Sequence, residues 1–308
     1  MTVVPFAGTL SGMNSTHRPP LVAILVVPLI AALILILFAW PSAKVGPRDL
    51  PVGVVGAQPF AAPGFEVHRY PSEAAARDAI ADREVYGALT GSKVLVASAA
   101  SAPVAQMLTH AAEGRPVEDV VPAPRASNAL GASVLPLVLG GVLTGIVAAL
   151  LGGGFWRRTG LVVTGSVLTG VGAALVVQSW LDVVGGDFFA NSAALSLMVL
   201  AIAATVTGLH ALLGNAGIAL GALTMIFLGN PFSGVATSPD MLPSGAGTLG
   251  QLLPPGAGGN LLRSTGFFDG AAAGGHVTVL AVWALLGLAL IAASGFRRPS
   301  PVVAVAAA

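Results

Sequence analysis

The chain of 308 residues contains no cysteine. Disulfide bonds, thiol chemistry and cysteine-ligated metal sites are therefore excluded. Charge is also scarce, because Asp, Glu, Lys and Arg make up 9% of the residues, and the two lysines are Lys44 and Lys93. The hydrophobic share is 55% and the mean hydropathy is +0.86, values that ordinary soluble domains of this length do not show. We therefore expect an α-helical integral membrane protein.

Sequence motifs for nucleotide, metal and nucleophile chemistry are missing as well. The chain contains no GxxxxGK[ST], so it does not bind ATP through a P-loop of its own. It contains no GxSxG elbow, and its histidines at 17, 68, 110, 210 and 276 lack metal-ligand spacing. We expect no enzymatic activity, no cofactor, no metal and no nucleic-acid partner.

Long apolar runs predict six membrane spans. The first is residues 21–40, LVAILVVPLIAALILILFAW, which has the length of about 20 residues that a bilayer requires. A secretory signal is the alternative, but its apolar core would be shorter and would precede an A-x-A-like cleavage site. A retained helix therefore fits this run better. Five further spans are expected at 132–154, 160–181, 191–213, 214–230 and 275–295.

Charge asymmetry predicts the orientation of these spans. With both termini inside, the cytoplasmic segments contain basic residues without any acid, namely Arg18, Arg157, Arg158, Arg297 and Arg298. All thirteen acidic residues then lie outside. The bias toward Arg, Ala, Gly and Val indicates a GC-rich bacterial genome. We therefore expect a multi-pass protein of the bacterial cytoplasmic membrane, with residues 1–20 and 296–308 in the cytoplasm.

Residues 42–128 form the longest polar region and predict a small extracytoplasmic α/β domain between the first two spans. Short strands are expected at 50–56, 65–70, 85–90 and 93–98, the last two as a hairpin. A helix is expected over 72–84, with Ser72 as its N-cap and Arg83 on the face of Ala76 and Ile80. A second helix begins at Ser101 and ends at Gly114. The domain is either a passive cap on the membrane bundle or a module that binds a partner or substrate.

Residues 231–274, before the last span, predict a broken helical hairpin on the outer face. Asn230-Pro231 ends a span, and 244–253 suits a short apolar helix. Pro254-Pro255-Gly256 breaks that helix, and a second short helix is expected over 260–268. Such a pair fits a re-entrant or interfacial hairpin whose backbone is shielded by protein. Arg263 pairs with Asp269 or reaches the lipid headgroups.

The spans themselves contain few polar groups. Gly141 and Gly145, like Gly217 and Gly221, have the four-residue spacing that brings membrane helices close together. Gln178 and His210 either form hydrogen bonds between helices or line a transport path. The full set of candidates for a transport path or gate is Gln178, His210, Asn230, Pro231, Pro254, Pro255, Gly256 and Arg263.

The order of these elements resembles the ABC-2-type transporter permease superfamily. It is most similar to members related to the phage-infection-protein group and to actinobacterial permease-like membrane proteins. The residues that carry the resemblance are LPVGVVG (50–56), SEAAARDAIADREVYGAL (72–89), and NPFSG (230–234) followed by GQLLPPGAGGNLLRSTGFFDG (250–270). The resemblance implies a homodimer, or pairing with a related permease subunit, in contact with membrane lipids. It also implies a separate nucleotide-binding ATPase subunit that drives export of lipids, drugs or polymers.

Permeases of this type contact their ATPase through a cytoplasmic coupling helix between the second and third spans. That connection is short here, GGFWRRTG at 153–160. Two hypotheses therefore stand side by side. The first is the permease subunit of an ATP-driven exporter, and the second is a non-transporting membrane receptor or envelope assembly factor with an outward-facing α/β domain.

Overall fold

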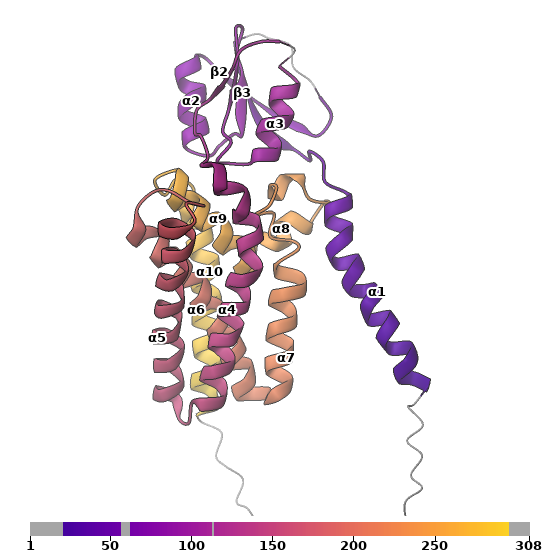
Figure 1. Cartoon of the computed structure of the whole chain (residues 1–308), viewed down its shortest axis with the longest axis vertical. Coiled ribbons are helices and arrows are strands. Elements are labelled where there is room, and N and C mark those ends of the chain that lie inside the picture. The colour runs from indigo at the N-terminus through magenta and orange to yellow at the C-terminus, as the bar shows by residue number, and fades with distance from the viewer. Residues whose placement is uncertain (1–20, 57–61, 113, 296–308) are drawn as a thin grey trace, which may run out of the picture.

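A computed structural model describes residues 21–56, 62–112 and 114–295. A small sheet domain lies at one end of a helical bundle, and the first helix stands beside that bundle (Figure 1). We call the end of the bundle that contacts the sheet domain the domain end, and the opposite end the far end. The predicted cytoplasmic segments 1–20 and 296–308, with Arg18, Arg297 and Arg298, lie outside the described residues.

Within the described residues, five helices are long and apolar enough to cross a membrane, consistent with a multi-pass membrane protein. They are α1 (Leu21–Ala43), α4 (Ala129–Leu151) preceded by the 3-10 turn η1 (Arg125–Asn128), α5 (Phe155–Ala174) continued by η2 (Leu175–Trp180), α6 (Phe188–Leu213) and α10 (Ala273–Ser294). The expected span over 214–230 is a shorter apolar helix, α7 (Asn215–Leu223) continued by η3 (Thr224–Gly229). At about 1.5 Å per residue it rises by roughly 22 Å, which is less than a hydrocarbon core of about 30 Å.

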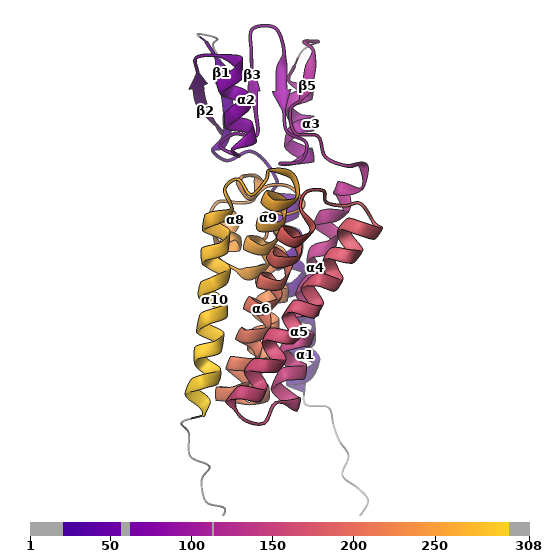
Figure 2. The same cartoon turned by 90° about the vertical axis from the view of Figure 1, so that its left-hand side faces the viewer.

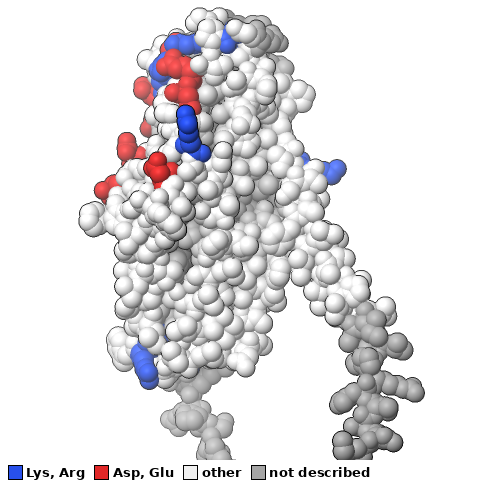
Figure 3. All heavy atoms as spheres, in the orientation of Figure 1, with Lys and Arg blue, Asp and Glu red and all other residues white. Residues whose placement is uncertain are grey.

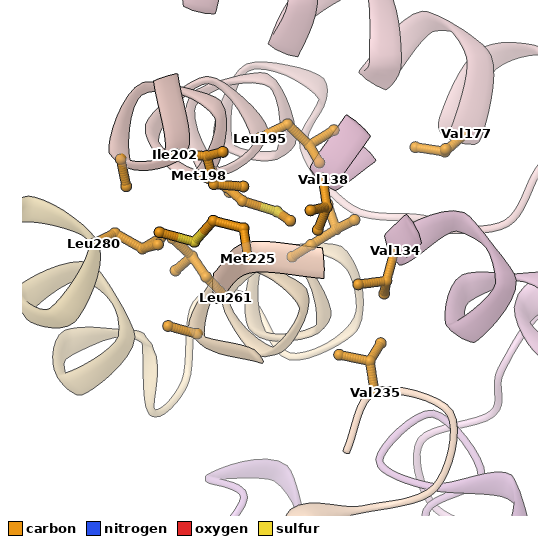
Figure 4. Packing of buried hydrophobic residues seen from close by; sticks show 14 of the residues in the cluster. Val134, Val138, Val177, Leu195, Met198, Ile202, Met225, Val235, Leu261 and Leu280 are labelled. Atoms are coloured by element: carbon orange, nitrogen blue, oxygen red, sulfur yellow. The ribbon is translucent and has the colours of Figure 1, made fainter. Parts of the chain in front are cut away.

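Helix α6 is the centre of the bundle, and 72% of its 18-residue apolar stretch is buried. The core around it contains large apolar side chains from α4, α6, η3, α9 and α10, among them Val138, Met198, Met225 and Leu280 (Figure 4). Small residues make this packing possible, because a Cβ on Gly145 would lie 2.9 Å from the Ala203 carbonyl oxygen. The expected packing role of the glycine pairs is confirmed.

The sheet domain contains a mixed five-stranded sheet with the order β2-β1-β3-β4-β5. The strands are β1 (Leu50–Val55), β2 (Phe65–Tyr70), β3 (Gly87–Leu89), β4 (Val94–Val96) and β5 (Val117–Asp119). The predicted hairpin is confirmed by the antiparallel pairing of β3 and β4, while β1 pairs in parallel with both β2 and β3. Sequence analysis missed β5, a three-residue strand that pairs in parallel with β4.

Two helices, both predicted, complete the domain (Figure 2). They are α2 (Glu73–Ala81) and α3 (Ala102–His110). Each begins at a serine N-cap: Ser72 Oγ accepts from the backbone nitrogen of Ala75, and Ser101 Oγ accepts from that of Val104. The expected extension of α2 to residue 84 is wrong. The helix ends at Ala81, and Arg83 has a positive φ of 63°, which turns it away from the helix face.

The hairpin before α10 is broken, as predicted, but its second helix begins earlier than expected. The short helices are α8 (Ala246–Gln251) and α9 (Pro254–Phe267), separated by Leu252 and Leu253. Pro254 and Pro255 are the first residues of α9 and not part of a loop that ends at residue 260. Proline is favoured in the first turn of a helix because its fixed φ suits the helix and its missing N–H has no partner there.

Among the described side chains, helix α1 packs against η3 and the following loop near the domain end (Figure 1). Phe38 and Trp40 make edge-on ring contacts with Phe227 and Phe232, at centroid distances of 6.1 and 6.3 Å. Just beyond the helix, Arg48 Nη1 donates to the carbonyl oxygen of Met241 at 3.0 Å. The 3-10 turn η4 (Pro239–Met241) thus anchors the segment between α1 and β1. Of the 18-residue apolar stretch of α1 itself, 6% is buried.

Charge is concentrated on the sheet domain and the adjacent end of the bundle (Figure 3). The visible side of the bundle below it is almost free of Lys, Arg, Asp and Glu until the far end. Arg157 and Arg158 lie at the far end, in the first turn of α5. An uncharged belt between two charged ends is the pattern of a membrane-spanning bundle.

Candidate functional site

The candidate site is a buried polar cluster at the junction between the sheet domain and helix α9, which lies directly below it (Figure 2). Three parts of the chain meet there: the turn after α2, the loop between η3 and α8, and α9 itself. We call this cluster the junction network and define it by Arg83, Tyr86, Val235, Asn260, Arg263 and Ser264.

Arg263 is the most deeply placed charge of the junction network, with 5% of its surface exposed. Its Nη1 donates to Asn260 Oδ1 at 3.1 Å, and its Nη2 donates to the Val235 carbonyl oxygen at 2.7 Å. Its Nε is buried and has no hydrogen-bond partner. The expected pairing with Asp269 is wrong, because among the described residues Arg263 forms no ion pair.

Asn260 connects the two arginines of the network. Its Oδ1 accepts from Arg263 and also from Arg83 Nη2 at 3.3 Å, while its backbone carbonyl accepts from Arg83 Nη1 at 3.2 Å. Arg83 further donates to Ser264 Oγ, and its guanidinium lies 5.3 Å from the ring centroid of Phe268. The positive φ of Arg83 therefore directs its side chain into α9, where it fixes the domain to the hairpin.

The network holds two guanidinium groups, and no carboxylate pairs with either of them among the described residues. Burial lowers the pKa of Arg83, and burial followed by the charge of Arg83 lowers the pKa of Arg263. A guanidinium group is not deprotonated in proteins, so both groups carry a charge. Buried charges are normally paired, because removing a charge from water is costly.

A second set of contacts attaches the loop between η3 and α8 to the domain. Tyr86 lies just before β3, and its hydroxyl donates to Asp240 Oδ2 at 2.8 Å and lies 2.7 Å from Ser238 Oγ. Burial, followed by the charge of Asp240, raises the pKa of Tyr86. Gln251 Nε2 donates to the Ser233 carbonyl oxygen at 2.8 Å, and Gln251 Oε1 accepts from Asn260 at 2.9 Å. The loop, both short helices and the domain are thus joined by one series of hydrogen bonds.

Of the eight predicted transport-path or gate residues, four lie in or beside this junction. Pro254, Pro255, Gly256 and Arg263 all belong to α9 and are buried. Gly256 approaches the Gly250 carbonyl oxygen so closely that a Cβ would lie 2.2 Å from it, and Gly229 approaches the ring of Pro255 in a similar way. These glycines allow α9 to pack against its neighbours without side chains between the backbones.

The other four predicted residues lie elsewhere. Asn230 and Pro231 line a separate hollow of about 390 Å³ between the bundle and α1. Gln178 Oε1 accepts from Asn191 Nδ2 at 2.9 Å, and Asn191 in turn accepts from Thr265 of α9, so Gln178 is linked to the hairpin indirectly. His210 lies near the end of α6 at the far end, with Nδ1 buried and unpartnered.

Sequence analysis missed Arg83, Tyr86, Asn260, Ser264 and Asp240 as members of a site. Asn260 and Arg263 are three residues apart in GGNLLRS, a spacing that places both on one face of a helix. That signal pointed to a polar face on α9. Nothing in the local sequence indicated the partner of that face, which comes from a turn 177 residues earlier.

Comparisons of the chain with protein-family models, with curated proteins and with solved structures find no match.

Proposed function

We propose that the protein is a permease-like membrane subunit of an exporter that takes an amphipathic substrate from the side, between α1 and the bundle. It crosses the bacterial cytoplasmic membrane six times, with α7 and η3 as the shortest crossing and both termini in the cytoplasm. A separate chain supplies the ATPase. The observation that supports this proposal best is the separation of α1 from the bundle.

The space beside α1 has the chemistry that an amphipathic molecule requires. From Leu25 to Ile36, α1 presents exposed apolar side chains, including Leu25 at 67% and Leu29 at 69% exposure. At the domain end the space leads to the hollow of about 390 Å³, whose lining combines Phe38 and Pro41 with the polar Asn230 and Ser233. An acyl chain therefore fits beside the helix while a polar head occupies the hollow.

A second copy of the chain completes the membrane surface of α1 in this proposal. The part of α1 that is separated from the bundle would face lipid, whereas helix pairs in membranes gain packing contacts. Because the chain has no cysteine, a single Leu29→Cys substitution in the full-length protein tests the pairing. We expect Leu29→Cys to form a covalent dimer with a short bifunctional thiol reagent in native membranes.

Leu168→Cys on α5 is the matched control, because Leu168 is also 69% exposed and α5 packs on α6 without a gap. It should remain monomeric under the same conditions. Equal cross-linking of the two variants would count against a dimer through α1. The transport step is tested separately: a nucleotide-binding subunit should co-purify in mild detergent, and deletion should abolish an ATP-dependent efflux.

One observation favours the non-transporting alternative. The connections at the far end are short in the described residues: Gly152–Gly154 joins α4 to α5, and Gly214 joins α6 to α7. They offer little surface to an ATPase. If no nucleotide-binding subunit co-purifies and efflux is unchanged by deletion, the protein is instead a membrane receptor or assembly factor that acts through its sheet domain.

A further inference from the structure

A second hollow, of about 360 Å³, lies beside the junction network, where the sheet domain, the start of α4 and α9 meet. We call it the junction pocket. This volume is within the range of small-molecule sites. Its polar lining residues are Ser98, Ser101, Gln106, Ser127, Asn128, Thr237 and Arg263.

Two independent features make the junction pocket electropositive. The first is Arg263, which contributes to its wall and combines 5% exposure with a buried Nε–H that has no partner. The second is the N-terminus of the nine-residue helix α3, since Ser101, Ala102 and Pro103 all line the pocket. The N-terminal end of a helix carries partial positive charge and favours anions.

The lining of the junction pocket contains no counter-charge. No aspartate or glutamate is among the described residues that line it. The acidic side chain nearest along the hydrogen bonds is Asp119, whose carboxylate is already bound by the backbone nitrogen and the Oγ of Ser98. Asp240 is further away and is bound by Tyr86 and Ser238. Two arginines, Arg83 and Arg263, therefore share one amide oxygen of Asn260 and have no carboxylate to balance them.

We propose that the junction pocket binds a phosphate-type anion, either free or as the headgroup of an anionic lipid, with Arg263 as its main charged contact. The anion supplies the negative charge that the junction network lacks and accepts from the free Nε–H of Arg263. Ser101 and Asn128 provide neutral donors around it, while Gln106 lies at the exposed edge of the pocket. This site is independent of whether the bundle transports a substrate.

The test uses the full-length protein in phosphatidylcholine nanodiscs and compares two sources of the anion. In the first arm inorganic phosphate is titrated at constant ionic strength, with chloride as the reference salt, while the unfolding temperature is recorded. In the second arm phosphatidylglycerol replaces part of the phosphatidylcholine without added phosphate, and bound lipid is counted by native mass spectrometry. A saturable rise in the first arm identifies a free anion, and retained phosphatidylglycerol in the second identifies a lipid headgroup.

Two variants connect the binding to the pocket. Arg263→Gln removes the charge, and Gln106→Glu places a carboxylate at the exposed edge of the pocket with almost no change of shape. Each should weaken binding about tenfold or more, as the loss of one charge-assisted contact implies. Gln106→Ala, and Arg157→Gln at the far end, should bind as the wild type does.

If Arg263→Gln does not fold, the comparison of Gln106→Glu with Gln106→Ala decides the question, because Gln106 is exposed and outside the core. The proposal is overturned if neither anion source binds. It is also overturned if Gln106→Glu binds phosphate and phosphatidylglycerol as tightly as Gln106→Ala.

Discussion

Asn260 gives the sharpest test of the junction network, because a single amide oxygen serves both the buried Arg263 and the partly buried Arg83. We consider two substitutions, Asn260→Ala and Asn260→Asp. Alanine removes the acceptor of Arg263 at 3.1 Å and of Arg83 at 3.3 Å, and also the donor to Gln251 at 2.9 Å. Aspartate keeps an acceptor of the same shape, adds a negative charge between the guanidinium groups and loses only the donor.

The two variants should change the free energy of unfolding by different amounts. Hydrogen bonds to charged groups contribute about 1.5–3 kcal/mol each and a neutral one about 1 kcal/mol. With some relaxation around the site, we expect Asn260→Ala to lower the free energy of unfolding by about 3–5 kcal/mol. Asn260→Asp should lie within about 1 kcal/mol of the wild type or be more stable, because the new carboxylate offsets the lost donor.

The assay is thermal unfolding of the full-length protein in a nonionic detergent, followed by tryptophan fluorescence. Trp283 reports on the hairpin directly, since its Nε1 donates to the Leu252 carbonyl oxygen at 2.8 Å. At about 2 °C per kcal/mol for a chain of this size, Asn260→Ala should lower the midpoint by roughly 6–10 °C. Asn215→Ala, at an exposed asparagine of the far end, is the control and should leave the midpoint unchanged.

Two results would refute this reasoning about Asn260. A midpoint of Asn260→Ala equal to that of the wild type would mean that the two arginines do not depend on this oxygen. Equal losses for the alanine and aspartate variants would mean that packing, and not charge, sets the stability of the site.

Three further predictions concern other parts of the molecule. Gly170→Ala should destabilise the protein by about 1–3 kcal/mol, because its Cβ would lie 2.4 Å from the backbone nitrogen of Ser196. Gly172→Ala is the control, since a Cβ there has no neighbour within 4 Å. Equal unfolding midpoints for the two variants would contradict the close packing of α5 on α6. Tyr86→Phe should cost about 1–3 kcal/mol and speed amide exchange at residues 238–241, while Tyr70→Phe, whose exposed hydroxyl bonds Glu84 at 3.3 Å, serves as the control. Hydrogen bonds from Arg77 and then Lys93 lower the pKa of Glu118 from 4.5 to about 2. The stabilising contribution of the Glu118 carboxylate is therefore complete above the unfolded pKa and is lost as the pH falls toward about 2. The unfolding midpoint of Glu118→Gln should lack this part of the acid dependence, and identical acid profiles of variant and wild type would disprove the role of the ion pairs.

Much of the sheet domain followed from local sequence patterns. The run FEVHRY predicted β2 with its observed bounds, and the side chain of Ser72 caps α2 as expected. These features depend on residues that are close together in the sequence, so local sequence patterns are enough to predict them. In contrast, β5 has three residues and no apolar alternation, and it exists only because the edge of β4 is available.

The candidate site was predicted only in part, for similar reasons. The chemistry of Arg263 was visible, but its contacts with Val235 and, through Asn260, with Arg83 depend on tertiary packing. Proline supplied an ambiguous signal at residues 254 and 255, because the same residue ends one helix and starts the next. The π-helical turns η2 and η3 have no sequence signature of their own and shift the ends of α5 and α7.

The attachment of α1 has a mechanical consequence. This helix of 23 residues joins the sheet domain near Arg48, which is held by the carbonyl oxygens of Lys44, Gly46 and Met241. It is therefore attached to the rest of the molecule at its domain end. Because α1 is about 35 Å long at about 1.5 Å per residue, a rotation of about 10° about this attachment would move its far end by about 6 Å. In the proposed function, such a rotation would widen or narrow the space between α1 and the bundle.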